Sequence, residues 1–279
     1  MLDGATMSVN PTAGLQRTVA VLGLLLLHLL LVPCAHAGSI SITMTATAEV
    51  KDGNLAVALK LGNSGDEAAS SVVPVLRWRD QEVRGTRRDA LDPGQTVNDT
   101  LTLPLGELGQ GRWPYRIAVD YTDANQYPFE ALHSATFTIG SPPPAKVAVP
   151  EIKVPGLSES TTASATVKNL AGTARTATVS FFVPDGLEAS EPTQKVELPP
   201  WETANVRATL INRTALAGSR YPIFLAVEYD EDGTHQALVS SSTVEVQQHR
   251  ALVSRGLLWV VGALVLAWVV VIVARRLSA

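Results

Sequence analysis

The sequence has few cysteines, few charged residues and few aromatic residues. A single cysteine among 279 residues cannot build a disulfide framework within the chain. Charged residues make up 17% and the formal net charge is -4, which excludes general nucleic-acid binding because that function needs a clearly basic surface. Hydrophobic residues make up 46%, which excludes an intrinsically disordered chain.

The sequence also lacks the motifs of catalysis. Beyond residue 37 the histidines are His133, His235 and His249, and no two of them stand at a metal-binding spacing. The chain has no P-loop, no dinucleotide fingerprint and no nucleophile-elbow motif. We therefore predict no catalytic residues, no cofactor, no metal site and no enzymatic activity.

An apolar run near the N-terminus indicates export. Residues Val19–Val32 are almost entirely apolar, and Ala35-His36-Ala37 follows them. An apolar stretch of about 7–15 residues before a small-x-small site is typical of a secretory signal. We predict a signal peptide over residues 1–37, with cleavage after Ala37. An uncleaved signal anchor and a lipid-modified Cys34 are the alternatives.

A second apolar run indicates membrane anchoring. Gly256–Val273 contains no charged residue, and as a helix it spans about 27 Å, close to the ~30 Å hydrocarbon core. A buried core helix is the alternative, but such helices carry a polar stripe. We predict a juxtamembrane segment over 247–255, a transmembrane helix over 256–273 and a cytoplasmic tail over 274–279. Arg275 and Arg276 then lie inside, which makes this a single-pass cell-membrane protein with its bulk outside the cytoplasm.

The residues between the two apolar runs read as short β-strands. Apolar and polar residues alternate through Ser39–Val50 and again from Leu55 to Leu61, on either side of Lys51-Asp52-Gly53-Asn54. An Asp-Gly pair between alternating runs is a hairpin signal. About seven such strands in ~100 residues are typical of an antiparallel β-sandwich.

The strand pattern occurs twice. Trp113-Pro114 and the Val-Asp-Tyr triplet after it match Tyr221-Pro222 and a Val-Glu-Tyr triplet, and Asn63 matches Asn169. Because the matches keep their order at a spacing of roughly 107 residues, we predict a duplicated unit. We expect β-sandwich domains over 39–140 and 147–246, joined by a Pro-rich linker over 141–146 that is extended and semi-rigid. The two asparagines are expected to close turns through side chain to backbone hydrogen bonds.

This pattern resembles bacterial extracytoplasmic immunoglobulin-like β-sandwich modules. The cell-adhesion-related bacterial domains, and the module beside the carbohydrate-binding domain of bacterial alpha-galactosidases, combine an Asn-turn, a Leu-x-Pro turn and a Val-acid-Tyr strand. Val183-Pro184-Asp185-Gly186-Leu187 is similar to a corner of the second family, with Leu187 in place of an aromatic residue. The resemblance implies an all-β fold of two tandem immunoglobulin-like sandwiches, with no catalytic residues to carry over.

One segment is a candidate binding surface. Arginines gather around a tryptophan in a predicted hairpin, at Arg77, Trp78, Arg79, Arg84, Arg87 and Arg88. They could form a groove for an anionic glycan or an acidic partner, or they could protect an edge hairpin against aggregation. The acidic turns at Asp120-Asp123-Asn125 and Glu228–Gly233 could offer oxygen ligands to calcium, although tight turns use the same residues.

The sequence therefore favours a membrane-anchored, non-catalytic interaction or scaffold protein of the cell envelope. The expected partners are the membrane, through the C-terminal helix, and a protein of the envelope. The alternative is a carbohydrate-binding accessory subunit of a polysaccharide synthesis, export or degradation system. Few tryptophans lie between the apolar runs, and we expect Trp113 to be in the core, which favours the first function.

Overall fold

The computed structural model describes residues 38–149, 151–247, 262 and 273–274. The chain divides into two compact units, Met1–Ser39 and Ile40–Ala279, and all of the strands lie in the second unit. Between residues 40 and 247, apart from residue 150, the chain forms strands, turns and loops only. This part of the chain is all-β, as the sequence predicts. The predicted signal peptide and nearly all of the predicted transmembrane helix lie outside the described residues.

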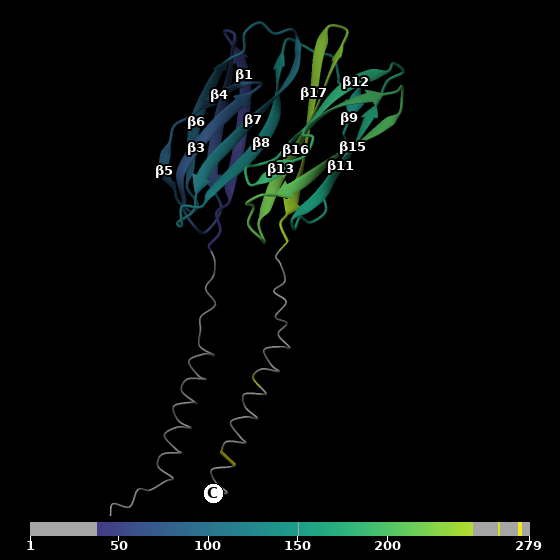
Figure 1. Ribbon diagram of the computed structural model, residues 1–279. Coiled ribbons are helices and arrows are strands. Elements are labelled where there is room, and N and C mark those ends of the chain that lie inside the picture. Colours follow the sequence, from purple (N-terminus) through teal and green to yellow (C-terminus); the bar gives the residue numbers. More distant parts are fainter. Residues whose placement is uncertain (1–37, 150, 248–261, 263–272, 275–279) are drawn as a thin grey trace, which may run out of the picture. The chain divides into compact units, whose positions relative to one another are not determined.

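Eight strands form the first half of the fold, drawn in purple to teal in Figure 1. They are β1 (Ile42–Lys51), β2 (Asn54–Asn63), β3 (Ala69–Trp78), β4 (Gln81–Arg84), β5 (Arg88–Leu91), β6 (Thr96–Pro104), β7 (Gly111–Thr122) and β8 (Pro128–Ile139). Strands β1, β2 and β6 form a three-stranded sheet that faces β3, β7 and β8 across a core of mostly aliphatic side chains. Two sheets that enclose one core make a β-sandwich.

Nine strands form the second half. They are β9 (Val147–Ala148), β10 (Ile152–Lys153), β11 (Ser160–Asn169), β12 (Arg175–Phe182), β13 (Leu187–Ala189), β14 (Thr193–Leu198), β15 (Thr203–Asn212), β16 (Arg220–Glu231) and β17 (Thr234–Glu245). A five-stranded sheet around β11 and β15 faces β12, β14, β16 and β17 across a second core. The first half and the second half therefore each have a hydrophobic core of their own.

The hairpin predicted at Asp52-Gly53 is confirmed. Lys51 pairs with Asn54 across the turn, and β1 and β2 keep an unbroken antiparallel register from there to Ile42 and Asn63. Asp52 and Gly53 both have positive φ, at 51° and 74°. A two-residue turn with two left-handed residues matches the twist of the strands it joins, which explains the Asp-Gly pair.

Asn63 and Asn169 occupy equivalent positions in the two halves. Each is almost fully buried, and each amide nitrogen donates to the carbonyl oxygen four residues ahead and to a leucine carbonyl, that of Leu91 or Leu198. Each side-chain oxygen accepts the backbone N–H two residues ahead. The prediction that both asparagines close turns through their side chains is confirmed, and the two turns have the same local structure.

One sheet runs through both halves. Its nine strands include β14-β12-β16-β17-β7-β3-β4 as a continuous path, with β17 and β7 joined in parallel at His235 and Gly111. The backbone N–H of His235 donates to the Gln110 carbonyl at 3.1 Å. A Cβ atom at position 111 would clash with the backbone carbonyl of His235, so glycine is required where the two halves meet.

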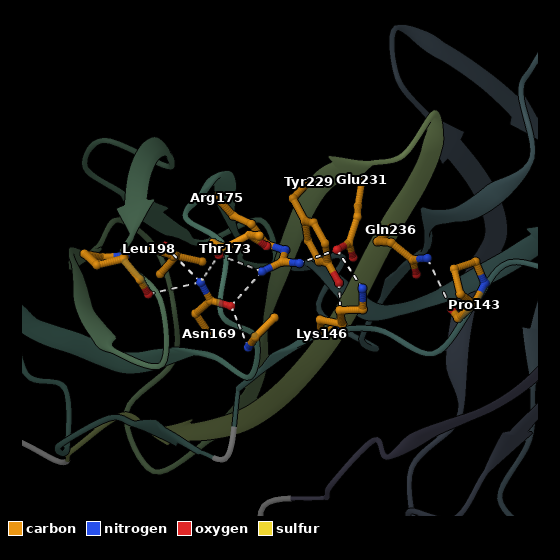
Figure 2. Close-up of polar contacts among 11 residues, drawn as sticks. Pro143, Lys146, Asn169, Thr173, Arg175, Leu198, Tyr229, Glu231 and Gln236 are labelled. Atoms are coloured by element: carbon orange, nitrogen blue, oxygen red, sulfur yellow. Dashed lines mark hydrogen bonds and ion pairs between the residues drawn. The ribbon is translucent and has the colours of Figure 1, made fainter.

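The Pro-rich linker is bound to both halves. The guanidinium of Arg112 donates to the Pro143 carbonyl at 2.7 Å and to the side-chain oxygen of Gln236 at 2.6 Å. The amide of Gln236 donates to the same carbonyl at 3.2 Å, as Figure 2 shows. The hydroxyl of Tyr229 accepts the backbone N–H of Lys146 at 2.7 Å. These bonds fix the course of the linker, while the domain limits at 140 and 147 stay a prediction.

Among the described residues, no helix is long and apolar enough to cross a membrane.

Candidate ligand-binding cleft

The structure does not gather the six residues of the predicted binding surface into one patch. Three of the arginines are held by their own neighbours: Arg84 by Glu82 and Asp120, Arg87 by the hydroxyl of Ser71, and Arg88 by the carbonyl of Asn98. Trp78 is only 3% exposed, and its ring meets Phe137 edge-on with the ring centroids 6.2 Å apart. Of the five arginines in this set, only Arg79 has no hydrogen-bond or ion-pair partner among the described residues.

Arg77 is tied to a buried carboxylate. Its Nη1 donates to Oε2 of Glu130 at 3.0 Å, and the Glu130 side chain is only 2% exposed. The other oxygen of Glu130 accepts the backbone N–H of Asp185 from the second half at 3.3 Å. Burial alone would lower the pKa of Arg77, but the charge and hydrogen bond of Glu130 raise it on balance. This ion pair therefore helps to join the two halves.

A cleft of about 180 Å³ lies where the first half meets the second. The side chains that decide its chemistry are three arginines, two aromatic residues and one acid: Arg77, Arg79, Arg116, Trp113, Phe182 and Glu228. Arg77 and Arg116 are directly opposite each other on β3 and β7. Arginines outnumber carboxylates in this lining, so the cleft favours an anionic group.

Two of these arginines have no anionic partner. Within residues 38–149 and 151–247, neither the Arg79 nor the Arg116 guanidinium has a carboxylate or another hydrogen-bond acceptor. Burial lowers the pKa of Arg116, and the positive charge of Arg77 lowers it further, while Glu130 offsets only part of this effect. Arg79 is exposed and Arg116 is half-buried, so a ligand anion at the cleft would offset the partial desolvation of Arg116.

Aromatic rings hold the two guanidinium groups in place. The Arg79 Cζ atom lies 4.5 Å from the ring centroid of Trp78 and 5.0 Å from that of Trp113. The Arg116 Cζ atom lies 4.5 Å from the ring centroid of Phe182, on β12 of the second half. Cation–π contacts of this kind orient a guanidinium and leave its N–H groups free to donate at the edge.

Glu228 is the acidic residue of the cleft lining, and His235 lies next to it. The His235 ring stacks on Trp113 with centroids 3.7 Å apart and an interplanar angle of 12°. Its Nε2 lies 3.2 Å from Glu228 and its Nδ1 lies 2.8 Å from Asp230. Burial alone would lower the pKa of His235, but the hydrogen bonds and charges of the two carboxylates raise it on balance. The imidazole therefore favours the charged form against the Trp113 face.

The acidic turns that could offer ligands to calcium make other contacts. The Asp123 carboxylate accepts the backbone N–H groups of Asn125 and Tyr127, both at 2.8 Å. Glu228 and Asp230 each lie within hydrogen-bond distance of a ring nitrogen of His235. Among the described residues, no group of three or more His, Cys, Asp or Glu side chains could hold a metal ion.

A second polar cluster lies inside the second half and is structural (Figure 2). Arg175 is 7% exposed; it forms an ion pair with Glu231 and donates to the side-chain oxygen of Asn169 at 2.9 Å. The Lys146 ammonium also binds Glu231, at 2.9 Å. Burial alone would raise the pKa of Glu231, but hydrogen bonds from Lys146 and Arg175 and their charges lower it on balance. The cluster fixes the end of the linker against β16.

Comparisons with known proteins give no assignment of function. No family model and no curated protein matches the chain. Among solved structures, the chain is similar to red sea bream transglutaminase, at 14% identity over 76% of this chain and 32% of that one, with a TM-score of 0.26. It is similar to Salmonella alpha-2-macroglobulin at 12% identity, over 75% of this chain and 16% of that one, with a TM-score of 0.32. It is also similar to a candidate carbohydrate-binding protein from Bacteroides uniformis at 10% identity, over 74% of this chain and 98% of that one, with a TM-score of 0.29.

Sequence reasoning found three residues of the cleft, Arg77, Trp78 and Arg79, and missed the rest. Arg116, Phe182 and Glu228 come from strands far apart in the chain and meet only because the halves pack together. Trp113, expected in the core, is half-buried and packs on that core from the junction. Phe182 carried a signal of the junction in the sequence. Side chains alternate along a strand, so Phe182, which directly follows the buried Phe181, points away from the core of its own half.

Proposed function

We propose that the chain is a membrane-anchored, non-catalytic interaction or scaffold protein of the cell envelope. In this proposal the two halves are tandem immunoglobulin-like β-sandwiches, exported by the segment over 1–37 and retained by a helix over 256–273. The membrane segments rest on the apolar runs in the sequence, which favour export and anchoring.

The observation that carries the scaffold proposal is the junction between the halves. A shared sheet, the Trp113–His235 stack and the Arg112–Gln236 hydrogen bond all act at one place. Tandem domains move relative to one another by default unless their interface is large or well bonded. A junction built in this way favours a fixed display of two surfaces, which is useful to a protein that positions a partner.

Glycine 111 provides a test of the scaffold proposal. Gly111→Ala should separate β17 from β7, because the added Cβ clashes with the His235 carbonyl. Gly109→Ala is the matched control, since a Cβ there meets nothing within 4 Å. We expect the full chain, cross-linked in membranes and then solubilised, to be isolated with a defined envelope partner in the wild type and the control, but not in Gly111→Ala. A wild-type chain isolated alone, or equal capture by all three proteins, would contradict the scaffold role.

Topology is tested separately. Alkaline phosphatase fused after Val246 should be active, because it folds only outside the cytoplasm and the proposal places this residue there. An inactive fusion at this point would overturn the anchoring arrangement, whatever the outcome with Gly111.

The second candidate is a carbohydrate-binding accessory subunit. The specific observation in its favour is a cleft in which two guanidinium groups, those of the exposed Arg79 and the half-buried Arg116, have no ion-pair or hydrogen-bond partner among the described residues.

A further inference from the structure

We propose that the cleft between the two halves binds a carboxylate-bearing sugar residue of an acidic polysaccharide. The two guanidinium groups of Arg79 and Arg116 would receive the carboxylate, and Glu228 would accept hydroxyl groups of the same residue. This inference goes beyond the scaffold role, which stands whether or not the cleft takes a glycan.

Charge favours a carboxylate as the ligand group. Arg79 and Arg116 line the same cleft, and neither has an anionic partner among the described residues. The planar guanidinium presents two parallel N–H donors, which match the two oxygens of a carboxylate. Arg77 adds a third positive charge to the lining, although Glu130 already binds it. A carboxylate in the cleft would complete the compensation that Glu130 only partly gives to Arg116.

Position favours this cleft over the rest of the arginine-rich segment. Arg84, Arg87 and Arg88 already have partners on their own strands or on neighbouring ones, so a ligand would have to displace them. Arg79 and Arg116 are held instead by aromatic rings, which leave their hydrogen-bond donors unused. The site is therefore prepared for an acceptor, and little reorganisation is needed on binding.

Glu228 distinguishes a sugar acid from an acidic peptide. One oxygen of Glu228 binds His235, and among the described residues its other oxygen has no hydrogen-bond donor. A carboxylate in a cleft for acidic peptides would repel the ligand. A uronate residue carries both a carboxylate and neighbouring hydroxyl groups, so it can satisfy the arginines and donate to Glu228 together. Ser180 lies in the same lining, with its hydroxyl hydrogen-bonded to that of Thr193 at 3.1 Å.

Size is consistent with one sugar ring. The cleft volume of about 180 Å³ is below the ~300–1,000 Å³ of pockets that enclose drug-sized ligands. A polymer would therefore place a single residue in the cleft and pass the rest of its chain across the surface. Affinity would then come from a few charge-assisted hydrogen bonds, which salt weakens.

The test uses the full chain in neutral detergent and three hexamers. Hexagalacturonate carries both carboxylates and hydroxyl groups, its fully methyl-esterified form keeps hydroxyl groups without charge, and hexaglutamate keeps charge without hydroxyl groups. We expect calorimetry to show binding of hexagalacturonate, at least tenfold weaker binding of hexaglutamate, and no binding of the ester. Absent hexagalacturonate binding, or equal binding of hexaglutamate, would overturn the proposal.

Variants locate the site. Arg79→Gln/Arg116→Gln should weaken hexagalacturonate binding at least tenfold, since each lost charge-assisted bond is worth about a factor of ten or more. Arg87→Gln/Arg88→Gln, which removes two arginines outside the cleft, should bind as the wild type does. Because neither Arg79 nor Arg116 has an ion pair or a hydrogen bond among the described residues, both double variants should melt close to the wild type, which separates lost binding from lost folding. Equal binding by the two double variants would overturn the assignment of the site.

Discussion

Asn169 is a buried polar residue whose removal should cost a large share of the stability of the second half. Its exposure is 0%, and the two N–H groups of its amide are shared among the carbonyls of Thr173, Leu198 and Pro199. Its side-chain oxygen accepts the Ala171 N–H at 3.0 Å and an Arg175 donor at 2.9 Å. Asn169→Ala would leave these five groups without that partner in a site that excludes water.

The magnitude follows from the number of bonds. A typical hydrogen bond contributes about 0.5–1.5 kcal/mol net, and a buried group left unsatisfied costs about 1–3 kcal/mol. Some of the five groups will find other partners or water, so we expect a loss of about 3–5 kcal/mol in the free energy of unfolding. Such a loss is a large part of the ~5–15 kcal/mol that stabilises an ordinary domain.

Asn205→Ala is the matched control. Asn205 is exposed on β15, and its side chain accepts one hydrogen bond, from the Thr166 hydroxyl at 3.1 Å. A surface substitution of this kind changes stability by about 0.5 kcal/mol or less. Urea unfolding of the full chain in neutral detergent, followed by circular dichroism, measures both variants. A loss below about 1 kcal/mol for Asn169→Ala would refute the view that this turn is held by its side chain.

Two further outcomes concern the junction. The pKa of His235 is raised in the folded chain above the ~6.5 of an unfolded one. The contribution of His235 to stability is therefore fully present below pH ~6.5 and is lost as pH rises through the raised value. The difference in unfolding free energy between wild type and His235→Gln should be larger at acidic than at alkaline pH, and a difference that grows with pH would contradict this. Trp113→Phe keeps an aromatic ring on His235 and removes an indole N–H that is buried without a partner among the described residues. Thermal melting should show a loss of stability within about 1 kcal/mol for Trp113→Phe, against about 3 kcal/mol for Trp113→Ala.

Local structure was predictable because the residues that specify it are neighbours in the chain. Asp52-Gly53 produced the expected hairpin, and Asn63 and Asn169 closed the expected turns. These features depend on backbone conformation and on hydrogen bonds to nearby segments, which residue type alone largely determines.

The binding site was not predictable because it depends on which surfaces meet. Nearness in sequence grouped Arg77 with Arg88, but side chains alternate along a strand and a turn reverses its direction. Arg88 therefore reaches the Asn98 carbonyl on β6, while Arg77 faces Glu130 on β8. The partners of Arg79 and Arg116 include residues more than thirty positions away, and a pattern in one strand cannot specify them.

The acid of the Val-acid-Tyr triplets has different contacts in the two halves. Asp120 and Glu228 occupy matched positions, and both point away from the core of their own half. Asp120 lies 3.7 Å from Arg84 within the first half, whereas Glu228 lies 3.2 Å from His235 beside the cleft. A position that reads as solvent-facing in each half thus has a different partner, because the adjacent basic residue is Arg84 of β4 in the first half and His235 of β17 in the second.

One sequence feature does indicate which sheet face of the second half is covered by the first half. Strands with one exposed face alternate strictly, as β11 and β15 do over much of their length. In β16, however, the run Ile223–Val227 is apolar at every position, and all five residues are buried. The outward-facing Phe224 packs edge-on against His133 of β8, with ring centroids 6.0 Å apart. An unbroken apolar run in a sandwich strand indicates burial of both faces, so β16 marks the sheet surface that the first half covers.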